Sequence, residues 1–275
     1  MSLTDKTLFI SGGSRGIGLE IALRAARDGA NVGLIAKTAE PNPRLPGTVF
    51  TAAEQIEAAG GSALPIVGDI RDATAVEDAV GATVERFGGI DVCINNASAI
   101  NLSGTEALEM KRYDLMQGIN TRGTFVVTRA CIPHLKRATN PHILTLSPPI
   151  SLEPRWLGPH IAYTIAKYGM SLCALGFAEE FRDAGIASNA LWPRTLIATA
   201  AVQNLLGGEE AMAASRKPAL YADAAYAVVT RPSRDCTGNM FLCEDVLAEE
   251  GVTDFDAYAY VPGATPQVDM FVDHV

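Results

Sequence analysis

The sequence predicts an α/β protein built on a single Rossmann-like, doubly wound parallel sheet of about seven strands, with helices on both faces. Short apolar runs alternate with stretches of helical periodicity along the whole chain, which is typical of a parallel sheet. The run Thr7–Ile10 turns through the glycine-rich Ser11–Gly18 into a helix, and Asn31–Ala36 closes a β-α-β unit. We expect residues 1–275 to form one domain, since α/β domains of this size are common as one unit.

The positions of these runs give the order of the elements. We expect strands at residues 7–10, 31–36, 63–67, 90–94, 142–146, 186–191 and 239–243. We expect helices at residues 17–28, 49–59, 73–87, 112–135, 162–182 and 222–229, where apolar residues recur at helical spacing. Residues 39–48, with Pro41, Pro43 and Pro46, form an irregular loop, and residues 194–218 form a lid-like segment without periodicity.

Composition excludes several classes of protein. The net charge is −9, the sequence pI is about 5.0 and no basic cluster is present, which argues against nucleic acid or a membrane as the main partner. The cysteines and the four histidines (His134, His142, His160 and His274) lack metal-ligand spacing, so we expect no metal site. The N-terminal residues lack a secretion-signal pattern and no apolar run reaches about 18 residues, so we expect a cytoplasmic protein.

The glycine-rich turn is the first candidate binding site. Gly12, Gly16 and Gly18 follow the spacing G-x3-G-x-G, which differs from the better-known G-x-G-x-x-G fingerprint. A strand that turns sharply into a helix leaves backbone N–H groups pointing outward, and the helix dipole attracts an anion to them. Such a motif can also be only a tight connection, but its β-α-β context favours a nucleotide phosphate.

The residue at the end of the second expected strand indicates whether a site binds NAD or NADP. The fold places the residue that meets the adenosine ribose there, and an Asp or Glu would pair with the 2′-hydroxyl of NAD. Lys37 stands at this position and Arg15 lies in the glycine-rich turn, so we expect NADP, with NAD less favoured. The alternative is that both are solvated surface charges.

Tyr163 and Lys167 form the candidate catalytic pair. They stand at i and i+4 and therefore lie on one helix face. A phenol with a pKa near about 10 is a poor base at neutral pH, and a neighbouring ammonium favours its ionised form. The spacing alone is common by chance and identifies no catalytic pair.

Taken together, these motifs resemble the short-chain dehydrogenase/reductase family. The resemblance rests on SGGSRGIG, Asp69-Ile70, Asn95-Asn96-Ala97, Asn120 within INTRGTF and YTIAK, in order and spacing, and it covers nearly the whole chain. AKTAEPNPRLPGT, LSPPI, NALWPRT and FDAYAYVPG resemble the hydroxysteroid-dehydrogenase-like group of that family, here without a sterol-carrier-like domain.

The resemblance implies roles residue by residue. Tyr163 would be the general acid/base, Lys167 would hold the nicotinamide ribose and lower the Tyr163 pKa, and Asn120 would keep a proton-relay water near Lys167. Asp69 and Ile70 would flank the adenine, and Asn96 with Ala97 would line the cofactor cleft. The implied cofactor-binding set is Gly12, Ser14, Arg15, Gly16, Ile17, Gly18, Lys37, Asp69, Ile70, Asn96, Ala97, Tyr163, Lys167 and Pro193.

The chain departs from the family pattern at two places. The family's substrate-binding serine is the second of a Ser-Ser pair, but here Ser147 is followed by Pro148 and Pro149. Proline has no hydrogen to donate, so Ser147 or Ser151 would have to reach the substrate oxygen. The family's Pro-Gly after the sixth strand is Pro193-Arg194, whose arginine can contact cofactor or substrate or point into water.

We therefore expect an NADP(H)-dependent enzyme that interconverts an alcohol and a carbonyl on an apolar small molecule. The alternative is an NADP-binding sensor or scaffold with weakened catalysis, which Pro148 in the serine slot favours. A reductase of carrier-bound 3-oxoacyl groups is a third possibility, but no basic docking patch is visible. The helical stretches 110–135 and 161–181 carry apolar residues on more than one face, and the resemblance implies that they form the contact of a homodimer or homotetramer.

Overall fold

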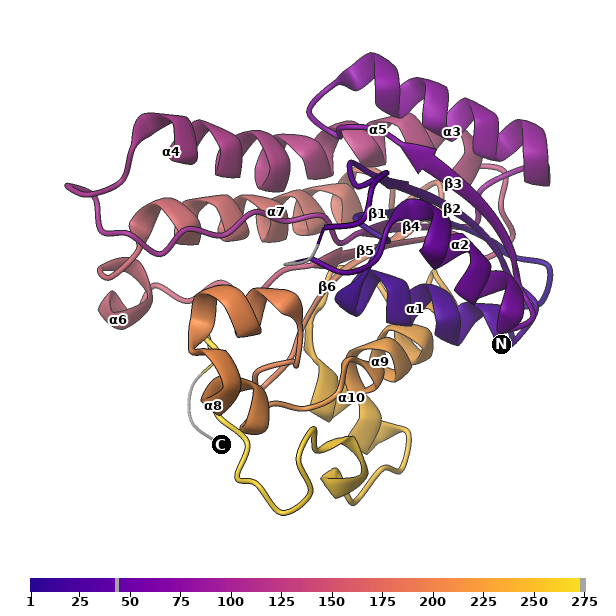
Figure 1. Ribbon diagram of the computed structural model, residues 1–275. Coiled ribbons are helices and arrows are strands. Elements are labelled where there is room, and N and C mark those ends of the chain that lie inside the picture. Colours follow the sequence, from indigo (N-terminus) through magenta and orange to yellow (C-terminus); the bar gives the residue numbers. More distant parts are fainter. Residues whose placement is uncertain (43–44, 273–275) are drawn as a thin grey trace.

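A computed structural model of the chain describes residues 1–42 and 45–272, so Pro43 and His274 lie outside the described residues. Seven parallel strands form one sheet in the order β3-β2-β1-β4-β5-β6-β7, which confirms the predicted doubly wound sheet (Figure 1). The strands are β1 (Thr7–Ser11), β2 (Asn31–Ala36), β3 (Ser62–Val67), β4 (Val92–Asn95), β5 (His142–Leu146), β6 (Ala187–Trp192) and β7 (Met240–Leu242).

Helices cover both faces of this sheet (Figure 1). They are α1 (Gly16–Ala26), α2 (Val49–Ala58), α3 (Ala73–Phe87), α4 (Met110–Gln117), α5 (Gly123–Leu135), α6 (Pro154–Leu157), α7 (Ile161–Glu180), α8 (Gly208–Ala213), α9 (Pro218–Thr230) and α10 (Cys243–Glu249). The order of the strands reverses between β1 and β4, where Ser11 lies opposite Asn95. Ligands of such folds bind beyond the carboxyl ends of the strands at this reversal.

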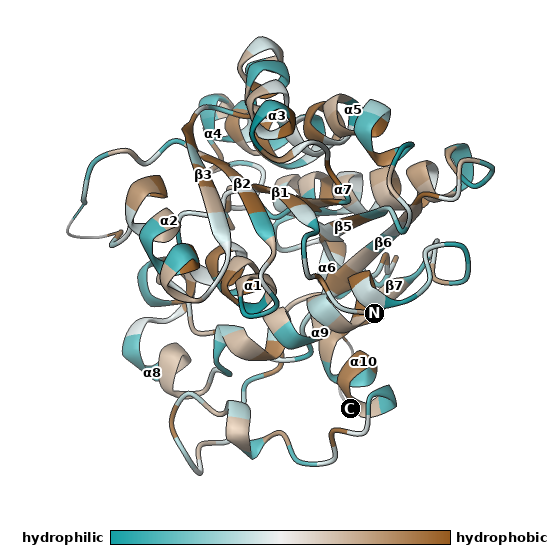
Figure 2. Cartoon of the chain, turned by 90° about the vertical axis from the view of Figure 1, so that its right-hand side faces the viewer, coloured by the Kyte–Doolittle hydropathy of each residue, from teal (hydrophilic) through white to brown (hydrophobic). Residues whose placement is uncertain are grey.

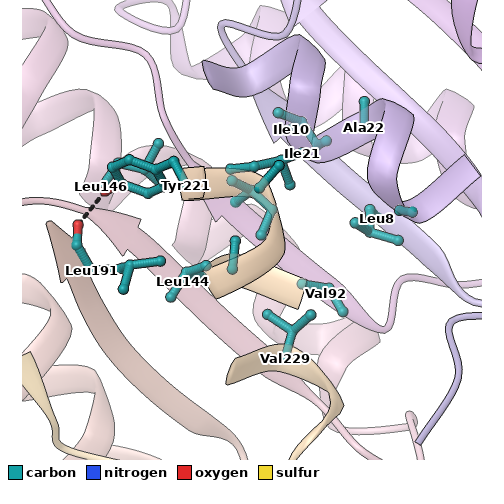
Figure 3. Packing of buried hydrophobic residues seen from close by; sticks show 14 of the residues in the cluster. Leu8, Ile10, Ile21, Ala22, Val92, Leu144, Leu146, Leu191, Tyr221 and Val229 are labelled. Atoms are coloured by element: carbon teal, nitrogen blue, oxygen red, sulfur yellow. Dashed lines mark hydrogen bonds between the residues drawn. The ribbon is translucent and has the colours of Figure 1, made fainter. Parts of the chain in front are cut away.

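Two apolar layers hold the helices on the sheet. One joins the strands to α1, α2, α9 and α10, and the other joins them to α3, α5 and α7. Figure 2 shows this segregation, with apolar strands lying between helices whose outer faces are polar. In the first layer the Tyr221 hydroxyl donates a hydrogen bond to the carbonyl of Leu191, which ties α9 to β6 (Figure 3). This bond satisfies a buried polar group inside an apolar layer.

The structure differs from the sequence-based expectation mainly in short elements. The helix expected at residues 112–135 is interrupted by a π-helical turn, Gly118–Arg122, between α4 and α5. The strand expected at 239–243 ends at Leu242, and Cys243 begins α10, which the periodicity did not predict. The segment 194–218 contains a second π-helical turn, Val202–Leu206, and α8. Helices of four to seven residues are too short to display an apolar period.

Among the described residues, α7 is the one helix long and apolar enough to cross a membrane by length and composition. Its most apolar 18-residue window is 61% buried inside the protein. Burial against a sheet and neighbouring helices explains this composition as that of a core helix.

His142 on β5 predicts an acid sensitivity of the fold. The side chain is buried, its Nε2 lies 2.9 Å from the carbonyl oxygen of Arg231, and burial lowers its pKa from 6.5 to about 4. The folded state thus excludes a proton that the unfolded chain accepts, so stability falls as the pH drops from 6.5 towards 4, by about 3 kcal/mol. Urea unfolding across this pH range measures the loss.

The matched variant is His142→Gln, which keeps a side chain that can donate to the Arg231 carbonyl but does not titrate. We expect the difference in unfolding free energy between wild type and variant to change with pH through this window. A difference that stays constant with pH would show that His142 is not the titrating group.

Candidate active site

The glycine-rich turn between β1 and α1 forms one end of the site. Gly12 and Gly16 adopt φ of +74° and +58°, which non-glycine residues rarely adopt. The side-chain nitrogen of Asn96 donates to the carbonyls of Ser11 and Gly12, at 3.0 and 2.8 Å, and a Cβ on Gly12 would lie 2.8 Å from that nitrogen. Within the described chain no side chain caps the start of α1, so its first N–H groups are left for a ligand.

A cavity of about 960 Å³ runs from this turn across the carboxyl ends of the strands. That volume is at the upper end of ligand-binding pockets. It brings together most of the residues predicted from the sequence: Gly12, Ser14, Arg15, Gly16, Ile17, Lys37, Asp69, Ile70, Asn96, Ala97, Tyr163, Lys167 and Pro193 all line it. These residues are separated by up to about 180 positions in the chain, and the sheet brings them to one edge.

Three predicted residues do not line the cavity. Gly18 lies beneath the turn, where a Cβ would be 2.5 Å from Asn96 Nδ2 and 2.8 Å from the Gly12 carbonyl oxygen. Asn120 lies in the π-helical turn, and its side chain accepts from the main-chain N–H of Ala99 at 2.7 Å and donates to the carbonyl of Ala99 at 3.0 Å. Gly18 therefore allows α1 to pack closely against Asn96 and Gly12. Asn120 holds the main chain of Ala99, which lines the cavity.

Ser147 is the third of these residues, and it ends the strand where the family serine is expected. Its side chain is fully buried, and its hydroxyl has no hydrogen-bond partner in the described chain. Ser151 is also absent from the cavity lining, with its main chain bonded to the Tyr168 hydroxyl. The Nε2 of His160, one turn before Tyr163, is another of the buried side-chain atoms that have no hydrogen-bond partner among the described residues.

Lys37 and Arg15, at the other end of the cavity, both have partners within the protein. Lys37 Nζ lies 3.2 Å from a carboxylate oxygen of Asp69, and Arg71 pairs with the same carboxylate at 2.6 Å. Arg71 and Lys37 hold the pKa of Asp69 well below its usual range, and the Arg71 hydrogen bond is the largest cause. The Arg15 guanidinium donates to the carbonyls of Leu45, Pro46 and Gly47, so it joins the irregular loop to the glycine-rich turn.

Tyr163 and Lys167 stand one turn apart on α7, and each side chain is about 4% exposed. Lys167 Nζ donates to the carbonyl of Leu146 at 2.9 Å and lies 5.0 Å from the ring centre of Trp192. Burial lowers the pKa of Lys167 to about 7 and raises the pKa of Tyr163 far above its usual range. Near neutral pH the Tyr163 phenol is therefore protonated and can donate its proton, while the charge of the neighbouring Lys167 changes with pH.

A segment that sequence reasoning missed, Gln267–Val272, completes the wall beside this pair. Asp269 and Met270 line the cavity, and Phe271 packs on Tyr163 with ring centres 6.1 Å apart. The stretch has no periodicity, so the only sequence signal was a carboxylate and an aromatic residue close together. Among the described residues, no group of three or more His, Cys, Asp or Glu side chains is arranged to hold a metal ion.

The glycine-rich turn and the tyrosine–lysine pair on one parallel sheet define a nucleotide-dependent oxidoreductase of the short-chain type. The family profile described as short chain dehydrogenase matches residues 6–209, and the chain belongs to this family of NAD(P)-dependent oxidoreductases. It is 57% identical over 271 residues to hydroxysteroid dehydrogenase-like protein 2 of Danio rerio, and 52% identical to the protein of that name from Homo sapiens. The match covers 98% of this chain but 65% of the Danio rerio protein, so the chain spans less than two thirds of that relative.

Solved structures agree with this assignment. A short chain dehydrogenase from Mycobacterium thermoresistibile is 68% identical, with a TM-score of 0.94, and the match covers 99% of this chain and 96% of that one. An NADH-dependent reductase complexed with NAD is 25% identical, with a TM-score of 0.72 and coverage of 87% and 95%. The resemblance predicted from the motifs is thereby confirmed for the family and for the hydroxysteroid-dehydrogenase-like group.

Proposed function

We propose that the protein interconverts an alcohol and a carbonyl on an apolar small molecule with NADP(H), and that Tyr163 is the general acid/base. One observation carries this proposal: Tyr163 and Lys167 line the same cavity as the glycine-rich turn. A panel of aldehydes and ketones, followed through the oxidation of NADPH, tests it. Turnover of apolar carbonyls is the expected result, and turnover of small charged ketones alone would contradict the apolar assignment.

The residues present fit a dinucleotide. In this proposal the turn at Gly12–Gly18 holds the pyrophosphate, Lys37 and Arg15 hold the 2′-phosphate, and Asp69 with Ile70 flanks the adenine. Asn96, Ala97 and Pro193 border the nicotinamide half. When bound, the nicotinamide supplies or accepts the hydride.

The protein's own residues move the proton. In the reductive direction Tyr163 donates its phenolic proton to the carbonyl oxygen, and in the oxidative direction the phenolate takes the hydroxyl proton. Lys167 holds the ribose hydroxyls, and in its protonated form it favours the phenolate that forms when Tyr163 gives up its proton. This effect is smaller than that of burial, which raises the Tyr163 pKa. Asn120 uses both side-chain polar atoms on Ala99, so a relay water near Lys167 would contact its main chain.

The absence of a serine at the family's substrate-binding position favours a second candidate function, an NADP-binding sensor or scaffold. Pro148 occupies that position, and neither Ser147 nor Ser151 lines the cavity, so the substrate oxygen has one donor fewer than in the family pattern. A protein that binds NADPH but oxidises it no faster with any carbonyl of the panel would support this candidate and contradict the enzyme.

The lid-like segment supports an apolar substrate. The cavity wall near Tyr163 includes Trp192 and Ile100, and the segment 194–218 adds Leu196, Ile197, Val202, Leu205 and Leu206. Such a wall buries the apolar body of a ligand and leaves a few polar groups to orient it. We propose that this segment acts as the lid of the substrate pocket.

Lys37→Glu is expected to reverse the cofactor preference. A charge-assisted bond to the 2′-phosphate contributes about 1.5–3 kcal/mol, so NADPH binding should weaken about 10- to 100-fold while NADH binding is kept or improved. Titration of the nicotinamide fluorescence measures both affinities. Lys111→Glu, which changes an exposed lysine paired with Glu109, is the control. Parallel losses for NADPH and NADH would refute the assigned role.

We further propose that α4, α5 and α7 form the contact of a homodimer or homotetramer. Exposed large apolar side chains lie on these helices, among them Met110, Phe125, Ile165 and Leu172. Ile165 and Leu172 are seven positions apart and so share one face of α7, which runs beside α5 (Figure 1). Apolar faces of this kind suit a second copy of the same helices.

A further inference from the structure

The segment Gln267–Val272 is fixed to the residues that follow β6 by main-chain hydrogen bonds. The N–H of Asp269 donates to the carbonyl of Arg194 at 2.9 Å, and the N–H of Leu196 donates to the carbonyl of Gln267 at 3.0 Å. The N–H of Gln267 in turn donates to the carbonyl of Ala214 at 2.8 Å, so the segment, yellow in Figure 1, lies close to the end of α8. The segment is therefore a built part of the site.

Phe271 anchors this segment among aromatic rings. It is 3% exposed and has a φ of +68°, a conformation that a bulky side chain adopts only where packing imposes it. Its ring centre lies 5.4–6.3 Å from the ring centres of Trp156, His160, Tyr163, Tyr168 and Trp192. The anchor fixes the main chain two residues away, at Asp269.

Asp269 lines the cavity that Tyr163 and Lys167 also line. One carboxylate oxygen of Asp269 accepts from the N–H of Met270 at 2.7 Å. Trp192 contacts both this segment and Lys167, since its Nε1 donates to the Met270 carbonyl at 2.9 Å and its ring centre is 5.0 Å from Lys167 Nζ. The segment that carries Asp269 and the side chain of Lys167 therefore contact the same indole ring.

We propose that Asp269 is the counter-charge of Lys167 and a positioning residue for the Tyr163–Lys167 pair. The proposal rests on the proposed function, because it assigns this carboxylate a part in the same proton transfer. A negative charge at this wall favours the protonated form of each neighbour. It therefore keeps Lys167 cationic and Tyr163 protonated, which are the forms needed to reduce a carbonyl.

The titration behaviour agrees with this geometry. Burial raises the pKa of Asp269 to about 7, and the charge of Asp269 acts to raise the pKa of both Lys167 and Tyr163. Among the described residues, the other titratable groups that interact electrostatically with it are Tyr221, Cys243 and Glu244. Above about pH 7 the Asp269 carboxylate is ionised. Its charge therefore affects the alkaline side of the pH dependence of carbonyl reduction, where Lys167 and Tyr163 lose their protons.

Asp269→Asn tests the proposal, because it removes the charge and keeps the shape. We measure the pH dependence of kcat for carbonyl reduction and, separately, that of the Kd for NADPH by nicotinamide fluorescence. Both alkaline limbs should move to lower pH by about one unit, since a nearby opposite charge shifts a pKa by about that much. Asp269→Glu should restore the wild-type limbs, and Asp183→Asn, at an exposed acid, should leave them unchanged.

Limbs that stay in place while kcat falls equally at every pH would overturn the proposal and show a merely structural residue. If Asp269→Asn does not fold, Asp269→Ser gives the same test with the same expected shift. Absence of carbonyl turnover in the wild type would refute the proposed function alone, because the pH dependence of NADPH binding still decides the role of Asp269.

Discussion

Tyr163→Phe is expected to lower kcat for carbonyl reduction by about 10²- to 10⁴-fold, the usual contribution of general acid catalysis. The variant loses one oxygen atom and keeps the ring that packs on Phe271. The Kd for NADPH should therefore change little. Steady-state assays of NADPH oxidation, with fluorescence titration of the cofactor, measure the two quantities separately.

The matched control for this variant is Tyr260→Phe, at an exposed tyrosine. We expect it to leave kcat and Kd as in the wild type. Equal rates for wild type and Tyr163→Phe would assign the observed turnover to another group and remove Tyr163 from the mechanism.

Gly18→Ala is expected to weaken cofactor binding. The added Cβ would lie 2.5 Å from Asn96 Nδ2 and 2.8 Å from the Gly12 carbonyl oxygen, so the clamp that shapes the turn must shift. Overpacking of this kind costs about 1–3 kcal/mol of stability. We expect the Kd for NADPH to rise at least about tenfold, the equivalent of about 1.4 kcal/mol.

Gly81→Ala gives a matched control, since Gly81 is also helical and a Cβ there meets nothing within 4 Å. It should stabilise the protein by about 0.5–1 kcal/mol, because alanine is the better helix former, and leave cofactor binding unchanged. Thermal unfolding and the same titration check both variants. Wild-type NADPH affinity in Gly18→Ala would contradict the role given to the turn.

The sheet could be predicted from the sequence because its central strands β1, β2, β4, β5 and β6 are buried almost throughout. Runs such as Thr7–Ile10 and Asn31–Ala36 are continuous apolar stretches bounded by turn residues, and their alternation with helical periods fixes a parallel topology. The glycine-rich turn was predictable for the same local reason, since its chemistry lies within eight consecutive residues.

The pairing of Tyr163 with Lys167 required the family resemblance, because an i, i+4 pair is common on helices. Contacts between segments distant in the chain had no local signal. The ion pair between Lys37 and Asp69, the hydrogen bonds of the Asn120 side chain to Ala99 and the placement of Asp269 and Lys167 in one cavity lining depend on tertiary packing. The π-helical turn at Gly118–Arg122 likewise shows no break in the apolar pattern.

The crystal structure of the complex with NADP⁺ tests the central claim most directly. We expect the pyrophosphate on the Gly12–Gly18 turn, the 2′-phosphate beside Lys37 and Arg15, the nicotinamide ribose on Lys167 and the nicotinamide ring beside the Tyr163 hydroxyl. A nicotinamide ring bound away from Tyr163, or a cavity that admits no dinucleotide at saturating NADP⁺, would contradict it.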